Sequence, residues 1–147
     1  ANLCANAIGQ EIFGALANEP HDKIQKWYKS QRDYYQYILF KLKKEFQKEL
    51  PGLIVSEPEA ALYCIIDFKN IASPNFDSLK FVQYCAKKGK IKIKNQFYTL
   101  LLAPMDGFYS NSKLGNTQLR IAIVETPEKI FLAPKILSKL YSNYSEL

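Results

Sequence analysis

Arginine is scarce in this 147-residue sequence. Lys and Arg together number 20, but only Arg32 and Arg120 are arginine. Lysine is a strongly hydrated point charge, whereas arginine offers a rigid fork that matches carboxylates and base edges. A protein that recognises nucleic-acid bases would therefore be expected to contain more arginine. The net charge of +6 indicates a lysine-rich, solvated surface, with weak attraction to anionic partners as the alternative.

Cysteine and histidine are also few. The three cysteines, Cys4, Cys64 and Cys85, lie far apart, and no CxxC pair occurs. This pattern argues against a disulfide framework and against a zinc site, and the single histidine, His21, cannot build a metal cluster at these spacings. Cys64 lies in an apolar run and is expected to be a buried, inert thiol. The simplest compartment is a reducing cytoplasm.

Long apolar runs and short catalytic motifs are missing as well. No run approaches the roughly 18 apolar residues of a membrane helix, so no membrane partner is expected. The motifs GxxxxGK[ST], GxGxxG, GxSxG and HExxH do not occur, which removes the common phosphate-loop, dinucleotide, serine-hydrolase and zinc-protease signatures. Hydrophobic residues make up 48% and charged residues 23%, as in a folded globular domain. Because the first residue is Ala, we expect the chain to be processed or cut from something longer.

Apolar residues at helical spacing predict two helices at the start of the chain. The first spans residues 1–18, with Asn2 or Asn6 as its cap, and Pro20 prevents its continuation. The second runs from about residue 21 to residue 50 and would span roughly 45 Å. Such a length is unusual in a small domain, so we expect this helix to bridge two bodies. Its apolar stripe comprises Ile24, Trp27, Tyr28, Tyr35, Ile38, Leu39, Leu42 and Phe46.

Residues 51–147 alternate between strand and helix patterns. Strands are predicted at 53–56, 62–68, 91–94, 98–103 and 118–125, and helices at 77–88 and 127–144. The run at 62–68 is almost continuously apolar, which favours a strand covered on both faces or a central strand. Pro134 predicts a kink or a break in the last helix. The fold class is α/β (α+β), with a small mixed sheet covered by helices and preceded by a long connecting helix.

Three segments carry a more specific signal. They are residues 59–67 (EAALYCIID), 102–109 (LAPMDGFY) and 118–122 (QLRIA). In this order they resemble a strand entry, a Pro-Gly-x-x-Phe loop and an arginine-bearing strand of the class I/II, fold-type I, pyridoxal-phosphate-dependent aminotransferases, aspartate aminotransferase among them. The chain departs from that pattern at Ala60, where the family often has Gly, and at Met105 and Asp106, which replace Gly-Ser.

The resemblance implies a domain division. Residues 1–20 would be the tail of the family's large domain, residues 21–50 its long connecting helix, and residues 51–147 its small C-terminal domain. It also implies an enzyme that moves an amino group between an amino acid and a 2-oxo acid, with pyridoxal phosphate as cofactor and a homodimer as its assembly. The family's cofactor-binding lysine lies upstream, so no catalytic, cofactor-binding or metal-binding residue is expected in this chain, which alone would be inactive.

The resemblance assigns Arg120 to the substrate carboxylate, and Gly107, Phe108 and Tyr109 to the active-site wall. The chemistry of Arg120 is coherent by itself, because a guanidinium fork binds a planar carboxylate through two parallel hydrogen bonds and a strand holds a residue firmly. From the residue alone, the alternative is a salt bridge at a strand edge.

A different function for the whole chain also stays open. A non-enzymatic basic α+β module that binds RNA or protein would explain the charge and the aromatic content of 14%. Such a module presents an open sheet face with exposed aromatic residues. The continuously apolar strands argue against an open face. No nucleic-acid partner is therefore expected, and the family resemblance implies none.

Overall fold

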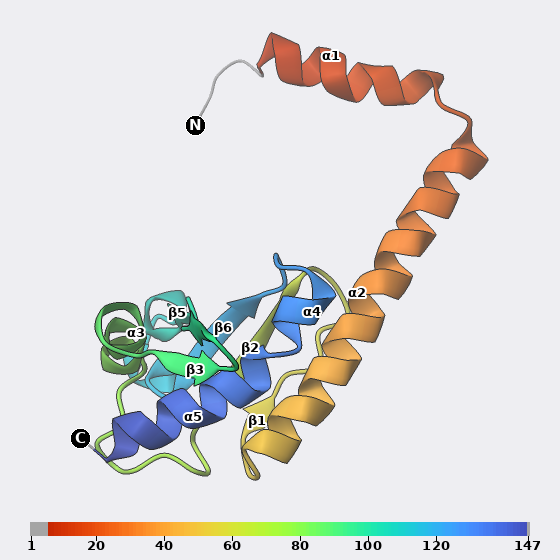
Figure 1. Cartoon of the computed structure of the whole chain (residues 1–147). Helices are drawn as coiled ribbons and strands as arrows, with labels where there is room; N and C mark the ends of the chain where they lie inside the picture. Colours follow the sequence, from red (N-terminus) through yellow and green to blue (C-terminus); the bar gives the residue numbers. More distant parts are fainter. Residues whose placement is uncertain (1–5, 147) are drawn as a thin grey trace. The chain divides into compact units, whose positions relative to one another are not determined.

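The computed structural model describes residues 6–146, and the chain divides into two units between Tyr34 and Tyr35. The first unit contains α1 (Ala7–Ala15), a 3-10 turn η1 (Leu16–Asn18) and the beginning of α2 (His21–Glu49). The second unit contains the remainder of α2 and every strand of the described chain (Figure 1).

The first unit begins with the predicted helix. The side chain of Asn6 accepts a hydrogen bond from the backbone amide of Gly9 at 2.9 Å, which confirms one of the two predicted caps. Asn2, the other candidate, lies outside the described residues. The large apolar side chains of α1, Ile8, Ile12 and Phe13, are all exposed. Helical spacing therefore located the helix, but none of these side chains is buried.

Helix α2 has the predicted length within one residue. Its buried residues, Ile38, Leu39, Leu42 and Phe46, all belong to the second unit. Trp27 is 58% exposed, although it continues the same apolar stripe. The stripe is continuous in the sequence, but only its second part packs into a core, because the core lies in the second unit.

The main sheet has four strands in the order β1-β2-β6-β5, and every pair is antiparallel. The strands are β1 (Ile54–Val55), β2 (Tyr63–Asp67), β5 (Ala103–Pro104) and β6 (Gln118–Ala122). The fold class is as predicted, but the mixed pairing is wrong. β2 and β5 do run in the same direction, as strands joined by a helical crossover do. β6 lies between them and pairs antiparallel with both, so no parallel pair forms.

Side chains alternate between the two faces of this sheet. Val55, Cys64, Ile66, Leu119 and Ile121 are buried in the core with side chains of the helices. Residues 62–68 contain a central strand, as one of the two predictions had it, since β2 lies between β1 and β6. The other prediction, a strand covered on both faces, is wrong, because Tyr63 is 41% exposed and lies on the other side of the sheet. We call that side the open face. Its residues are Ile54, Tyr63, Ile65, Asp67, Ala103, Gln118, Arg120 and Ala122.

The remaining helices are α3 (Ser78–Lys87), α4 (Pro127–Ile130) and α5 (Ala133–Ser145). The predicted break at Pro134 is confirmed, because the last helical segment is divided into α4 and α5. Pro134 stands in the first turn of α5, where its missing amide hydrogen costs no helical bond. α5 lies beside the end of α2, where the Ser138 hydroxyl donates to the carbonyl of Glu49 at 3.1 Å (Figure 1).

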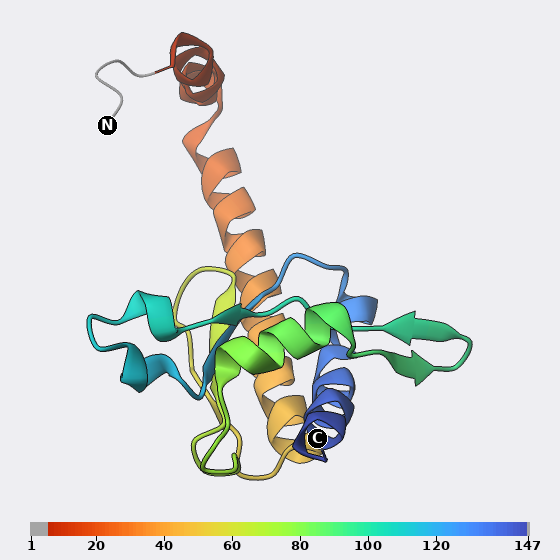
Figure 2. The ribbon, with the colours of Figure 1, turned by 90° about the vertical axis from the view of Figure 1, so that its left-hand side faces the viewer.

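The strands predicted at 91–94 and 98–103 are arranged differently. β3 (Ile91–Ile93) and β4 (Gln96–Tyr98) form a separate hairpin, which projects from the body of the second unit (Figure 2). The turn between them is tight, and Lys94 takes a left-handed φ of 54°. The alternating residues therefore pair with each other in this local hairpin. After the hairpin the chain returns to the main sheet at β5.

Candidate functional site

Arg120 stands in the middle of the main sheet. In β6 it lies opposite Ile65 of β2 on one side and opposite Ala103 of β5 on the other. β6 is therefore an internal strand, and a salt bridge at a strand edge does not describe this residue. The arginine is half-buried, and its side chain leaves the sheet on the open face.

Two aromatic rings hold the guanidinium of Arg120. Its Cζ atom lies 4.7 Å from the ring centroid of Tyr63 and 5.1 Å from that of Phe108. Cation–π contacts of this kind contribute about 0.5–2 kcal/mol each, depending on exposure. A guanidinium donates hydrogen bonds in its own plane, so ring contacts orient the group without using its N–H donors.

The charge of Arg120 has no carboxylate partner in the described chain. Four ion pairs occur among residues 6–146, and none includes Arg120. Asp67 is the one carboxylate of the open face, and its oxygens accept hydrogen bonds from the side chains of Thr117 and Gln118. The arginine is thus an oriented cation whose donors are available to an external anion.

The three predicted wall residues belong to, or follow, the 3-10 turn η2 (Asp106–Phe108). Phe108 contacts Arg120 directly. Tyr109 reaches the open face through its hydroxyl, which donates to Gln118 Oε1 at 2.6 Å. Gly107 makes no comparable approach, since a Cβ atom placed on it would have no neighbour within 4 Å. The structure therefore brings two of the three to the surroundings of Arg120.

Several residues around Arg120 were not singled out from the sequence. Tyr63 lies inside the first family-like segment, but its contact with Arg120 follows from the register of β2 against β6. Gly115, in the 3-10 turn η3 (Ser112–Gly115), is buried directly against η2, since a Cβ atom there would lie 2.5 Å from the carbonyl carbon of Met105.

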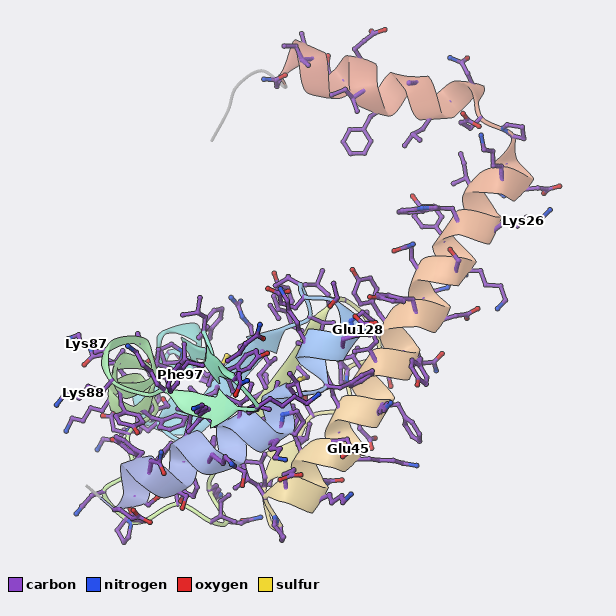
Figure 3. All side chains as sticks on the ribbon, in the orientation of Figure 1. Lys26, Glu45, Lys87, Lys88, Phe97 and Glu128 are labelled. Atoms are coloured by element: carbon purple, nitrogen blue, oxygen red, sulfur yellow. The ribbon has the colours of Figure 1, made fainter. Side chains whose placement is uncertain are left out.

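Arg120 is also the only cation on the open face as defined above. The segment 78–105 contains six lysines and no acidic residue. These lysines lie on α3, the hairpin and the loops around them, and Lys87 and Lys88 extend from the end of α3 (Figure 3). Phe97 of the same hairpin is 68% exposed, and its ring centroid lies 6.0 Å from Lys92 Nζ. None of these six lysines belongs to the open face.

Cys64 and Cys85 are free and buried. Burial raises the pKa of Cys64 to about 11 and that of Cys85 to about 12, so both thiols stay protonated, as the sequence predicted for Cys64. Cys4 lies outside the described residues. Among residues 6–146 no group of three or more potential ligands could hold a metal ion. None of the helices described here combines the length and the apolarity that crossing a membrane requires.

Comparison with known proteins supports the fold. No family model matches the sequence, and no curated protein matches it either. The structure resembles that of N-succinyldiaminopimelate aminotransferase from Mycobacterium tuberculosis, with a TM-score of 0.63 and 17% sequence identity. The match covers 81% of this chain but only 28% of that enzyme's chain. The chain therefore has the fold of a part of an aminotransferase, as its resemblance to that family predicted.

Proposed function

We propose that this chain is the C-terminal domain of a pyridoxal-phosphate-dependent aminotransferase, in which Arg120 binds the carboxylate of the substrate. The parent enzyme would move an amino group between an amino acid and a 2-oxo acid. One observation carries the proposal: Arg120 is an oriented cation on the open face, without a carboxylate partner in the described chain. The aminotransferase fold supports the family.

The task of Arg120 follows from its geometry. A substrate carboxylate is planar and accepts two parallel hydrogen bonds from a guanidinium fork. The strand and the rings of Tyr63 and Phe108 restrict the guanidinium before the substrate arrives, so less ordering is needed on binding. The carboxylate end of the substrate is then fixed, which orients the α-carbon for reaction. Covering the open face in the parent enzyme would exclude water and strengthen this ion pair.

The open face offers no attachment site for the cofactor. When bound, pyridoxal phosphate supplies an electron sink for reactions at the α-carbon. The open face contains no lysine among its eight residues, and Tyr63, its one aromatic residue, contacts Arg120. This face therefore fits a carboxylate and does not fit the attachment of the cofactor. The proposal places the cofactor-binding lysine elsewhere in the parent protein, which we propose to be a cytoplasmic homodimer.

The proposal is tested by changing Arg120→Lys in the full-length protein that contains this chain. Lysine keeps the charge but loses the bidentate fork. Replacing two charge-assisted hydrogen bonds by one is expected to lower kcat/KM for an amino acid by about 10- to 100-fold. The matched control is Arg32→Lys, which changes the other arginine of these 147 residues, at an exposed position of α2, and should leave kcat/KM unchanged.

A second substrate makes the test specific to the carboxylate. The amine that corresponds to the amino acid without its carboxylate reacts slowly but can still be assayed. Arg120→Lys should leave its kcat/KM unchanged, since this substrate offers nothing for the guanidinium to bind. An equal loss for the amine and the amino acid would show that Arg120 has a general structural role and would reject the proposal.

The alternative, a basic α+β module that binds RNA or protein, has no support from the comparison. The expectation that apolar strands leave no open face is wrong, because the sheet does have an open face and Tyr63 is exposed on it. However, the Tyr63 ring contacts Arg120, and no observation favours a base or a peptide on this face.

A further inference from the structure

We propose that Tyr109, Gln118 and Asp67 are positioning residues that hold the Phe108 ring against Arg120 and so orient the guanidinium for a carboxylate. The proposal rests on the proposed function only in its last step. The positioning itself is a property of the free chain and can be measured there.

The three side chains form a continuous line of hydrogen bonds across the sheet. The Tyr109 hydroxyl donates to Gln118 Oε1 at 2.6 Å, and Gln118 Nε2 donates to Asp67 Oδ2 at 3.1 Å. Asp67 is held in turn, because its Oδ1 accepts from the Thr117 hydroxyl at 2.6 Å and from the amide of Lys69 at 2.9 Å. Both ends of the Gln118 amide are therefore used, and the line joins the η2 turn to β6 and β2.

This line matters for Phe108 because little else holds its side chain. Phe108 is 59% exposed, so packing in the core does not fix the ring. Its backbone belongs to a single 3-10 turn, in which the amide of Phe108 donates to the carbonyl of Met105 at 3.0 Å. Gln118 holds this turn through two hydrogen bonds. Its backbone carbonyl accepts from the amide of Met105 at 3.1 Å, and its side-chain Oε1 accepts from the Tyr109 hydroxyl.

Gln118 also stands beside the arginine. It lies two residues before Arg120 in β6, so both side chains project from the open face, roughly 7 Å apart along the strand. Gly115 supports the turn from another direction, since a Cβ atom there would lie 2.6 Å from the amide nitrogen of Asp106. The turn that carries Phe108 is thus attached to the same strand that carries Arg120.

The consequence is a restricted guanidinium. An arginine side chain has several rotatable bonds, and a site that must order it on binding loses affinity. A ring kept in place by Tyr109 removes part of that freedom in advance. The hydrogen-bond line should therefore influence the binding of a carboxylate more than the chemical step, which is the pattern expected of positioning residues.

The test uses nuclear magnetic resonance on the 147-residue chain. The measured quantities are the order parameter of the Arg120 Nε–Hε bond and the upfield ring-current shifts of its side-chain protons. In the unchanged chain the order parameter should be close to that of rigid backbone, about 0.8. Tyr109→Phe removes only the hydroxyl, and the order parameter should then fall below about 0.6, with loss of the ring-current shifts. Phe108→Leu should cause the same fall, because it removes the ring itself.

The matched control is Tyr98→Phe. Tyr98 also donates its hydroxyl to a glutamine, Gln96 Oε1, at 2.5 Å, but does so in the hairpin away from the open face. This variant should leave the Arg120 signals unchanged. The positioning proposal is overturned if Tyr109→Phe leaves the Arg120 signals unchanged, or if Tyr98→Phe changes them equally.

Kinetics of the full-length protein separate this proposal from the proposed function. Tyr109→Phe should raise KM for an amino acid by about threefold to tenfold and change kcat less, with no effect on the corresponding amine. If the Arg120 signals change and KM does not, the ring is positioned as proposed but Arg120 does not bind the substrate carboxylate. That result would reject the proposed function and leave the positioning established.

Discussion

Arg120 lies directly opposite Ile65 in the pairing of β6 with β2. The side chains of both residues are on the open face, while their neighbours Cys64, Ile66 and Leu119 are buried in the core. The core therefore holds the backbone on which Arg120 stands, and the guanidinium itself is left outside the core. A strand with this division of roles can carry a ligand-binding residue without a loss of core packing.

Gly115 should be essential to the loop that carries Phe108. In Gly115→Ala the new Cβ atom would lie 2.5 Å from the carbonyl carbon of Met105, and backbone atoms cannot move aside as a flexible side chain can. We expect a loss of about 1–3 kcal/mol in the free energy of unfolding, measured by urea denaturation. Gly107→Ala is the matched control in the neighbouring turn, where the added methyl group has open space. Its effect should stay within about 0.5 kcal/mol, and equal effects would contradict the expected packing of η3 on η2.

Replacing Ala61 with glycine should stabilise the folded chain. Its φ is 65°, a left-handed conformation that costs an L-residue about 1–2 kcal/mol. This conformation falls one residue after Ala60, the position at which the family resemblance expects glycine. Ala61→Gly should raise the urea midpoint by the equivalent of about 0.5–1 kcal/mol, since the relief of strain exceeds the added entropy of the unfolded chain.

Ala60→Gly is the control for this prediction. Ala60 is exposed like Ala61 but does not have a positive φ. Glycine there brings only the entropic cost, so stability should fall by up to about 1 kcal/mol. Two shifts of the same sign would show that the left-handed conformation does not limit stability at this position.

The buried thiols should make stability fall at high pH. Burial raises the pKa of Cys64 and Cys85 to about 11 and about 12, whereas an unfolded thiol titrates near pH 8.5. Between about pH 8.5 and 11 the unfolded state therefore loses protons that the folded state retains, and its free energy drops relative to the folded state. The urea midpoint should decline over this range, and less steeply in the variant with both Cys64→Ala and Cys85→Ala. Equal slopes would contradict the assignment to these thiols.

The same thiols should react slowly in the folded chain. With Cys4→Ser removing the third cysteine, iodoacetamide at pH 8 should label Cys64 and Cys85 at least about 100-fold more slowly in buffer than in denaturing urea, because the thiolate is the reactive form. Mass spectrometry of timed samples measures both rates. Rapid labelling of either residue in buffer would contradict its burial.

The isolated chain should lack a specific attachment site for pyridoxal phosphate. It contains 18 lysines (20 Lys and Arg less two Arg), and none lies on the open face. After incubation with the cofactor and reduction with borohydride, peptide mapping should find adducts spread over several exposed lysines. Chain unfolded in urea serves as the control and should give a similar spread. A single lysine modified stoichiometrically in the folded chain alone would contradict the prediction.

Local features of this fold were predictable from the sequence because their causes are local. The cap at Asn6, the extent of α2 and the break at Pro134 each depend on residues within a turn or two. The hairpin at residues 91–98 was not predicted, since a tight turn at Lys94 decides it and lysine carries no strong turn signal. The open face was missed because an apolar run does not reveal how many of its faces a helix covers.

The site around Arg120 likewise combines features that the sequence predicts with features that depend on the tertiary structure. The sequence by itself determined that an arginine, rare in a lysine-rich chain, stands in a strand after a Gly- and Asn-rich loop, and it determined the family resemblance. Only the tertiary structure decided that β6 is internal, that Tyr63 and Phe108 contact the guanidinium, and that Tyr109, Gln118 and Asp67 form one hydrogen-bonded line. The physical reason is distance along the chain: Asp67 and Gln118 meet only because the core sets the register between β2 and β6.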